Sequence, residues 1–214
     1  FAIIAILAVL FSVSSYQTLN KLRIDNSLTI WFLEEDPSYK AYIEFQEKFG
    51  SDEIFIAMFP VENALEENEI NQLSRLHEAI DSLSYVKTSF SLAKAKYPIY
   101  ANQKIIFDDL YNSKRSENGL KNLFSKLPNI TSQLVSKDYK NLFFYIQLNP
   151  TPTIEQKRQL ILGELTSIIE NHFNNYHLTG PPVLNEAYSK GIYKESLIFG
   201  VLTDDTMQQA IDRA

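Results

Sequence analysis

The stretch Leu142–Leu148 (LFFYIQL) carries the strongest strand signal in this chain of 214 residues. Aromatic and aliphatic side chains of this kind favour a buried strand. The sequence Asn149-Pro150-Thr151-Pro152 follows at once, and proline ends a strand because it lacks the backbone N–H. We therefore expect Leu142–Leu148 to be a buried strand that stops abruptly.

Shorter runs on both sides predict further strands at Glu53–Phe59, Tyr85–Leu92 and Tyr176–Thr179. Two longer segments, Leu65–Leu83 and Thr153–Phe173, have apolar residues at helical spacing. The positions on the two expected buried stripes are Ile70, Leu73, Leu76, Ile80 and Leu83 in the first helix, and Ile161, Leu165, Ile168, Ile169 and His172 in the second. The elements therefore follow the order β-α-β, an irregular insertion, and β-α-β.

This order is typical of the split βαβ, or ferredoxin-like, sandwich, an α+β fold. Right-handed crossovers would place both helices on one face of a four-stranded antiparallel sheet. The pattern is lost from Ala93 to Asn129, where we expect loops and one or two short helices such as Leu120–Leu127. The whole insertion covers about residues 93–139. The other sheet face needs a cover, for which this insertion, the helix described next and a second copy of the domain are all candidates.

A short helix is expected just before the first strand. Asp36 is a good N-cap and Pro37 suits the first helical position, while Gly50 stands where a left-handed cap would end the helix. We expect this helix to pack on the domain.

The first residues, Phe1–Val13, contain a single polar side chain, and no charge appears before Lys21. An uncharged run of about 20 residues approaches the length of a membrane-spanning helix. We interpret residues 1–22 as part of a transmembrane helix; a signal-peptide remnant and a buried core helix are the alternatives. Residues 23–195 would form an extracytoplasmic α+β domain. Residues 196–214 would be the start of a second membrane helix or an aberrant tail, because Asp204-Asp205 interrupts the apolar pattern.

Composition excludes several classes of function. The chain has no cysteine, which rules out disulfides and thiolate chemistry. Its formal charge of −6 argues against nucleic acid as a partner. Neither a GxGxxG nor a GxxxxGK motif is present, so these phosphate-binding loops are not indicated.

Titratable residues do not form a recognisable site either. The histidines, His77, His172 and His177, lack the spacing of metal ligands. The acidic clusters are best explained as solvated loops and, for the first, a helix cap: Glu34-Glu35-Asp36, Asp108-Asp109 and Asp204-Asp205. We therefore predict no catalytic, cofactor-binding or metal-binding residue, no cofactor, and a protein that is not an enzyme.

Four short stretches carry more information together. They are Arg23–Leu28 (RIDNSL), Phe49–Glu53 (FGSDE), Val86–Leu92 (VKTSFSL) and Leu178–Leu184 (LTGPPVL). In this order and context they resemble the first extracytoplasmic loop of an RND-superfamily transporter of the MMPL, or predicted-exporter, branch. The resemblance covers about residues 1–202 and implies a porter domain of ferredoxin-like units between two membrane helices.

The resemblance further implies a fragment of a proton-driven efflux protein in the bacterial cytoplasmic (inner) membrane, with this domain on the periplasmic side. The implied partners are the lipid bilayer, a hydrophobic or lipid-like substrate, and the remaining transporter domains or a companion porter subdomain. The family's proton-relaying carboxylates would lie in later helices. In this arrangement Asn185–Glu195, with Lys190, Tyr193 and Lys194, would return to the membrane near Leu19–Arg23. The alternative is a membrane-anchored extracytoplasmic interaction or scaffold module without transport activity.

Overall fold

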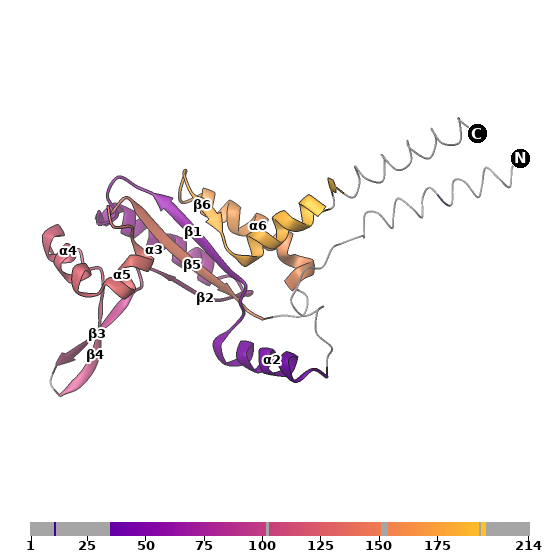
Figure 1. Ribbon diagram of the computed structural model, residues 1–214. Helices are drawn as coiled ribbons and strands as arrows, with labels where there is room; N and C mark the ends of the chain where they lie inside the picture. The colour runs from indigo at the N-terminus through magenta and orange to yellow at the C-terminus, as the bar shows by residue number, and fades with distance from the viewer. Residues whose placement is uncertain (1–10, 12–34, 102, 151–153, 193, 196–214) are drawn as a thin grey trace, which may run out of the picture. The chain divides into compact units, whose positions relative to one another are not determined.

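A four-stranded antiparallel sheet forms the centre of the computed structural model (Figure 1). Its strands are β1 (Ile54–Pro60), β2 (Val86–Ser91), β5 (Asn141–Leu148) and β6 (His177–Thr179), in the spatial order β2-β5-β1-β6. The four predicted strands therefore share one sheet, as expected, with their ends displaced by about one residue. The expectation of an α+β fold is confirmed.

The structure describes Phe11 and residues 35–101, 103–150, 154–192 and 194–195. The chain divides into two compact units, Phe32–Glu186 and a second unit of Phe1–Trp31 with Ala187–Ala214. The expected membrane segments Phe1–Val13 and Ser196–Leu202 lie outside the described residues, except for Phe11, which is helical. None of the helices within the described ranges is long and apolar enough to cross a membrane.

The two central strands alternate between a buried and a half-buried face. In β1 the pattern buries Phe55, Ala57 and Phe59, and in β5 it buries every second residue from Leu142 to Leu148. Because successive side chains point to opposite faces of a strand, all these residues lie on the same sheet face. The direct cross-strand pairs, such as Ala57 with Phe144, continue this face from strand to strand.

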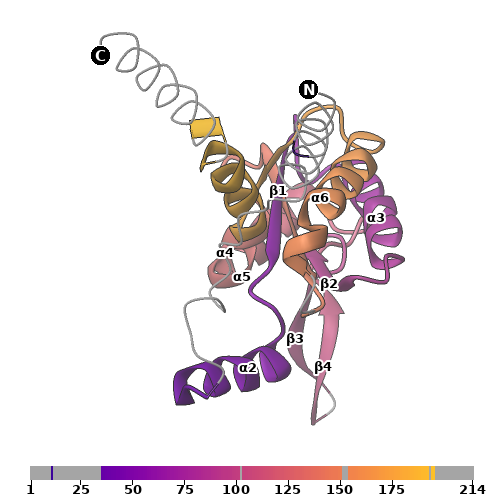
Figure 2. The same cartoon turned by 90° about the vertical axis from the view of Figure 1, so that its right-hand side faces the viewer.

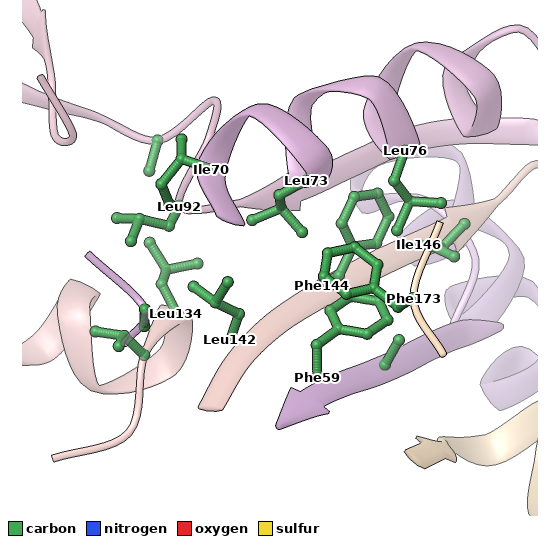
Figure 3. Packing of buried hydrophobic residues seen from close by; sticks show 14 of the residues in the cluster. Phe59, Ile70, Leu73, Leu76, Leu92, Leu134, Leu142, Phe144, Ile146 and Phe173 are labelled. Atoms are coloured by element: carbon green, nitrogen blue, oxygen red, sulfur yellow. The ribbon is translucent and has the colours of Figure 1, made fainter. Parts of the chain in front are cut away.

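Two helices cover this face. Helices α3 (Glu67–Asp81) and α6 (Ile154–Glu170) contact each other and lie on the same side of the sheet (Figure 2). Figure 3 shows Leu73 and Leu76 of α3 pointing toward Phe144 on β5. The ring of Phe59 on β1 stacks on the ring of Phe173, which follows the end of α6, with their centroids 4.0 Å apart. The buried positions on the helices are Ile70, Leu73, Leu76, His77 and Ile80 on α3, and Arg158, Ile161, Leu165 and Ile169 on α6. Leu83, Ile168 and His172, which the periodicity also predicts on these stripes, are half-buried.

Helix α2 (Pro37–Phe49) has the predicted start but not the predicted packing. Asp36 is its N-cap and accepts a hydrogen bond from the Ser38 backbone N–H at 2.7 Å. No residue of α2 is buried, which corrects the expectation of a helix packed on the domain. Gly50 has φ 95° and ψ 176°, so its φ is positive, as expected, but its backbone is not left-handed helical.

The insertion contains more regular structure than its sequence pattern predicted. Strands β3 (Lys96–Ala101) and β4 (Lys104–Asp109) form a separate two-stranded sheet, followed by α4 (Glu117–Lys126) and α5 (Pro128–Leu134). The expectation that residues 93–129 hold only loops and short helices is therefore wrong for the hairpin. Residues on both faces of β4 are exposed, so its sequence lacks the alternation that reveals a strand with one buried face.

The core can be tested on one helix. Leu165 is fully buried on α6, whereas Leu160 on the same helix is 73% exposed. Replacing Leu165 with Ala should lower the free energy of unfolding by about 2–5 kcal/mol, because it removes buried methyl groups and leaves a cavity. Leu160→Ala is the matched control and should change it by less than about 0.5 kcal/mol. Urea denaturation of both variants measures the difference, and equal effects would contradict the assigned core.

Candidate functional site: the junction at the start of strand β1

Two of the four resembling stretches, Phe49–Glu53 and Leu178–Leu184, meet at the start of β1. Gly180 follows β6 with φ +118°, and a Cβ atom there would lie 2.1 Å from the carbonyl oxygen of Ile54. Any side chain would therefore collide with the backbone of the neighbouring strand, and the backbone conformation itself favours glycine. The glycine lets the end of β6 lie directly against the start of β1.

Gly50 occupies a second tight position in this junction. A Cβ atom at Gly50 would lie 2.5 Å from the side-chain nitrogen of Gln147. That nitrogen donates hydrogen bonds to the carbonyl oxygens of Ser51, at 2.8 Å, and Phe49, at 3.3 Å. Gln147 belongs to β5, so the central strand holds the turn that leads from α2 into β1.

The polar residues that follow Gly50 also have partners. The Ser51 hydroxyl accepts a hydrogen bond from the Glu53 backbone N–H at 3.0 Å. Asp52 accepts hydrogen bonds from the Tyr42 hydroxyl, at 3.0 Å, and the Gln46 amide, at 3.1 Å, both on α2. Partial burial and this carboxylate raise the pKa of Tyr42 above its ordinary value, so the phenol stays protonated and remains a donor. Asp52 therefore ties the exposed helix α2 to the sheet.

Glu53 forms a buried ion pair with Arg158 of α6. The Arg158 Nη2 lies 2.7 Å from the Glu53 Oε1, and only 4% of the arginine side chain and 11% of the glutamate side chain are exposed. The Arg158 Nε reaches the other carboxylate oxygen at 3.4 Å. A charge in such a position has to be paired, because leaving water is costly for an isolated ion.

Arg158 is the residue that the sequence interpretation missed. It lies three and seven positions before Ile161 and Leu165, on the same apolar stripe of α6. A single cation on a stripe that faces a core is a signal for a buried anion, but it does not identify which of the chain's acidic residues pairs with it. Together these contacts make the junction a mechanical connection between α2, α6 and the sheet.

The second face of the sheet is a separate candidate surface. It carries a row of apolar side chains from β2 across β5 to β1, in which Phe90 lies opposite Tyr145 and Tyr145 lies opposite Ile56. Met58 and Phe143 form the next cross-strand pair. Phe90 is 40% exposed and the other four are half-buried, so this face is accessible in part to an apolar partner.

His77 lies in a buried polar chain on the opposite face. Its Nδ1 is 2.6 Å from the Ser89 hydroxyl and its Nε2 is 2.7 Å from the Ser91 hydroxyl. Ser89 donates to the carboxylate of Asp81, which also binds Lys94. Since the Ser89 hydroxyl hydrogen is used by Asp81, Ser89 accepts from a protonated Nδ1, and Nε2 is left to accept from Ser91.

Burial, together with the positive charge of Lys94, lowers the pKa of His77 to about 4, although Asp81 acts in the opposite direction. Burial alone would raise the pKa of Asp81, but the hydrogen bonds from Lys94 and Ser89 outweigh it and hold that pKa below its ordinary value. A serine hydroxyl on a histidine has the geometry of a hydrolase nucleophile and base. His77 and Ser91 are both fully buried, however, so these two groups are not accessible to a substrate. Their hydrogen bonds connect α3 to β2.

The remaining candidate residues stay apart. His172 contacts the carbonyl oxygen of Ile168 at 2.9 Å, and His177 is exposed on β6. Asp108 pairs with Arg115 at 2.9 Å and Asp109 with Lys96 at 3.6 Å. Within the described ranges no three histidine or acidic side chains come together in a way that could hold a metal ion. Glu34 and Asp204-Asp205 lie outside these ranges.

Comparison with known proteins adds no relative. Neither the protein-family models nor the curated proteins contain a match to this chain.

The buried ion pair makes a first prediction for the junction. Glu53→Gln should lower the free energy of unfolding by about 3 kcal/mol, because it removes the carboxylate from a buried guanidinium. Asp109→Asn breaks an exposed ion pair with Lys96, in which the lysine side chain is 58% exposed and the aspartate side chain 67%. This variant should lower the free energy of unfolding much less. Chemical denaturation near pH 7 measures both variants. A Glu53→Gln chain as stable as the parent would contradict this assignment.

His77 makes a second prediction, on pH. Between about pH 6.5 and pH 4 the unfolded chain binds a proton at this residue while the folded chain does not, so stability should fall as the pH falls. Across this pH range the free energy of unfolding should decrease by about 3 kcal/mol in total. His77→Gln should remove this part of the pH dependence, whereas His177→Gln, at an exposed position, should retain it. Denaturation curves across this range measure the slope, and an unchanged slope in His77→Gln would refute the argument.

Proposed function

We propose that this chain is the periplasmic porter domain, with adjoining membrane segments, of a proton-driven RND-superfamily exporter of the MMPL branch. The observation that carries the proposal is the sheet order β2-β5-β1-β6 with both crossover helices on one face. Taken without the hairpin, this is the strand order of the ferredoxin-like, split βαβ sandwich from which such porter domains are built. The strand order supports the fold, and the resembling stretches and the place where the chain enters and leaves the sheet support the proposed function.

The positions of the resembling stretches support the same proposal. Phe49–Glu53 and Leu178–Leu184 are far apart in the sequence, yet Gly180 touches the carbonyl of Ile54. Each stretch supplies a glycine at a position where a side chain would collide with a neighbour. This gives the resemblance a physical basis in part, because two of the four stretches that carry it close the junction.

The junction also lies where the chain enters and leaves the sheet. The chain comes from α2 through Gly50 into β1, and it leaves β6 through Gly180 into helical residues 181–192. A domain inserted between two membrane segments needs its two ends at one place, and domain ends are often close together. We infer that residues before α2 and after residue 192 connect this domain to the bilayer.

For a hydrophobic or lipid-like substrate, the half-buried second face is the best candidate contact surface. Its row of Phe90, Tyr145 and Ile56 offers apolar and aromatic groups, which dominate the lining of ligand sites. A companion subdomain that moved as a rigid body against this face would expose and cover it in turn. In this proposal the Glu53–Arg158 pair keeps the sheet and α6 moving together.

The second candidate is a membrane-anchored interaction module without transport activity. The hairpin of β3 and β4 favours it, because exposed apolar side chains on both of its faces suit a protein partner. The reading frame of the gene distinguishes the two candidates. An open reading frame that continues into several more hydrophobic helices supports the exporter, and a stop codon directly after Ala214 supports the module.

Location is tested with a single cysteine, since the chain has none. The exposed Lys137 is changed to Cys in the full chain, and intact spheroplasts are treated with a membrane-impermeant maleimide. We expect labelling without lysis, and recovery of the labelled chain in carbonate-washed membranes. A chain that is labelled only after lysis, or that leaves the membranes in carbonate, would overturn both candidates. Gln133, also exposed and in the same part of the insertion, provides a second cysteine position as a control for local effects.

A further inference from the structure

The hairpin of β3 and β4 has two outer edges that differ. In β4 the exposed fractions are 67% for Ile105, 46% for Ile106 and 67% for Phe107. In β3, Pro98 stands opposite Phe107. Within the described residues, neither outer edge is paired with a further strand.

The hydrogen-bond pattern shows which backbone groups face outward. The Leu110 N–H donates to the Ala95 carbonyl at 2.8 Å, so this pair is hydrogen-bonded. Hydrogen-bonded and non-hydrogen-bonded pairs alternate along an antiparallel ladder. Ile105 and Phe107 therefore direct their backbone N–H and C=O groups away from β3. Pro98 occupies an outward position on β3, where its missing N–H blunts that edge.

The open β4 edge is a template for another strand, and its sequence selects a second copy of itself. We propose that two copies of this chain pair antiparallel through β4, around a twofold axis that passes between the two Ile106 residues. In this register Lys104 lies opposite Asp108 of the second copy, and Ile105 lies opposite Phe107. Unlike charges and apolar side chains that lie directly opposite each other stabilise a sheet. A four-stranded sheet, with both β4 strands in its centre, results.

Neighbouring symmetric registers are poorer. A register centred on Ile105 puts Lys104 opposite Ile106, and one centred on Phe107 puts Asp108 opposite Ile106. Both place a charge against an apolar side chain and lose the pairing of unlike charges. The Ile106-centred register also places Ile105 and Phe107 of both copies next to each other on one face. There each of these side chains can cover part of the exposed surface of its neighbours. Asp108 remains within reach of Arg115 of its own chain, at 2.9 Å, and shares its carboxylate.

The interface is short, and interfaces of this size associate weakly in solution. Attachment of both copies to one membrane would raise their effective concentration. A cross-link that traps the paired state is therefore the appropriate measurement. It is simple here, because the chain has no cysteine of its own.

The experiment uses the full chain in mild detergent with Ile106→Cys, and oxidation by copper phenanthroline. Two Ile106 positions would face each other across a non-hydrogen-bonded pair, within the separation that a disulfide bridges. Tyr100→Cys is the matched control, since Tyr100 is 75% exposed on the same hairpin. In the proposed sheet the two Tyr100 positions are separated by three strand spacings and offset by two residues along the strands, which puts them about 16 Å apart. We expect the Ile106→Cys dimer to form at least about tenfold faster, because only this pair meets disulfide geometry.

A charge change distinguishes pairing in the proposed register from a random collision of the two cysteines. Lys104→Glu in the Ile106→Cys chain would put two carboxylates opposite each other and should slow the cross-link. Lys114→Glu makes the same change in net charge at an exposed position outside β4 and should leave the rate unchanged. Far-UV circular dichroism checks that each variant is folded. Equal rates for Ile106→Cys and Tyr100→Cys, or no effect of Lys104→Glu, would overturn the proposal.

Discussion

The pairing of β1 with β5 is the constraint on which the rest of this structure depends. It joins seven residues of β1, from Ile54 to Pro60, to seven of β5, and each of the other two strands attaches to one member of this pair. A slip of one residue would place Phe55 and Phe59 of β1 on the opposite face of the sheet from the buried residues of β5. Helices α3 and α6 would then meet the wrong side of one strand. Their placement, and with it the whole core, therefore follows from this register.

The elements around that pairing were predictable because each has one buried face. The apolar run of Glu53–Phe59 and the helical spacing of Leu73, Leu76 and Leu165 reflect this burial in the sequence. The hairpin was not predictable by the same means, because a strand exposed on both faces has no such pattern. Likewise, the caps of α2 were visible in the sequence, but its lack of buried residues was not, since α2 is held by polar contacts with Asp52.

The candidate junction was predictable in part. Its glycines were visible as members of two short stretches, but nothing in the sequence shows that Gly180 lies against Ile54. Arg158 depends on a partner 105 residues away, and pairs at such distance are settled only by the fold. The His77 chain was missed for a similar reason. Ser89 and Ser91 face the core at positions where a strand usually carries apolar residues, and two hydroxyls become informative only when a histidine lies between them.

Pro98 has a consequence for how far the β4 edge can be extended. A hairpin with two open edges could add copies at both sides and grow into a continuous ribbon of molecules. Here one edge lacks an N–H at its middle position, so a strand added there would lose a ladder hydrogen bond. In the proposed pairing, Pro98 therefore disfavours the addition of further copies at the β3 edge and favours a closed pair. The same proline blunts one edge of an exposed apolar hairpin against pairing with strands of other chains.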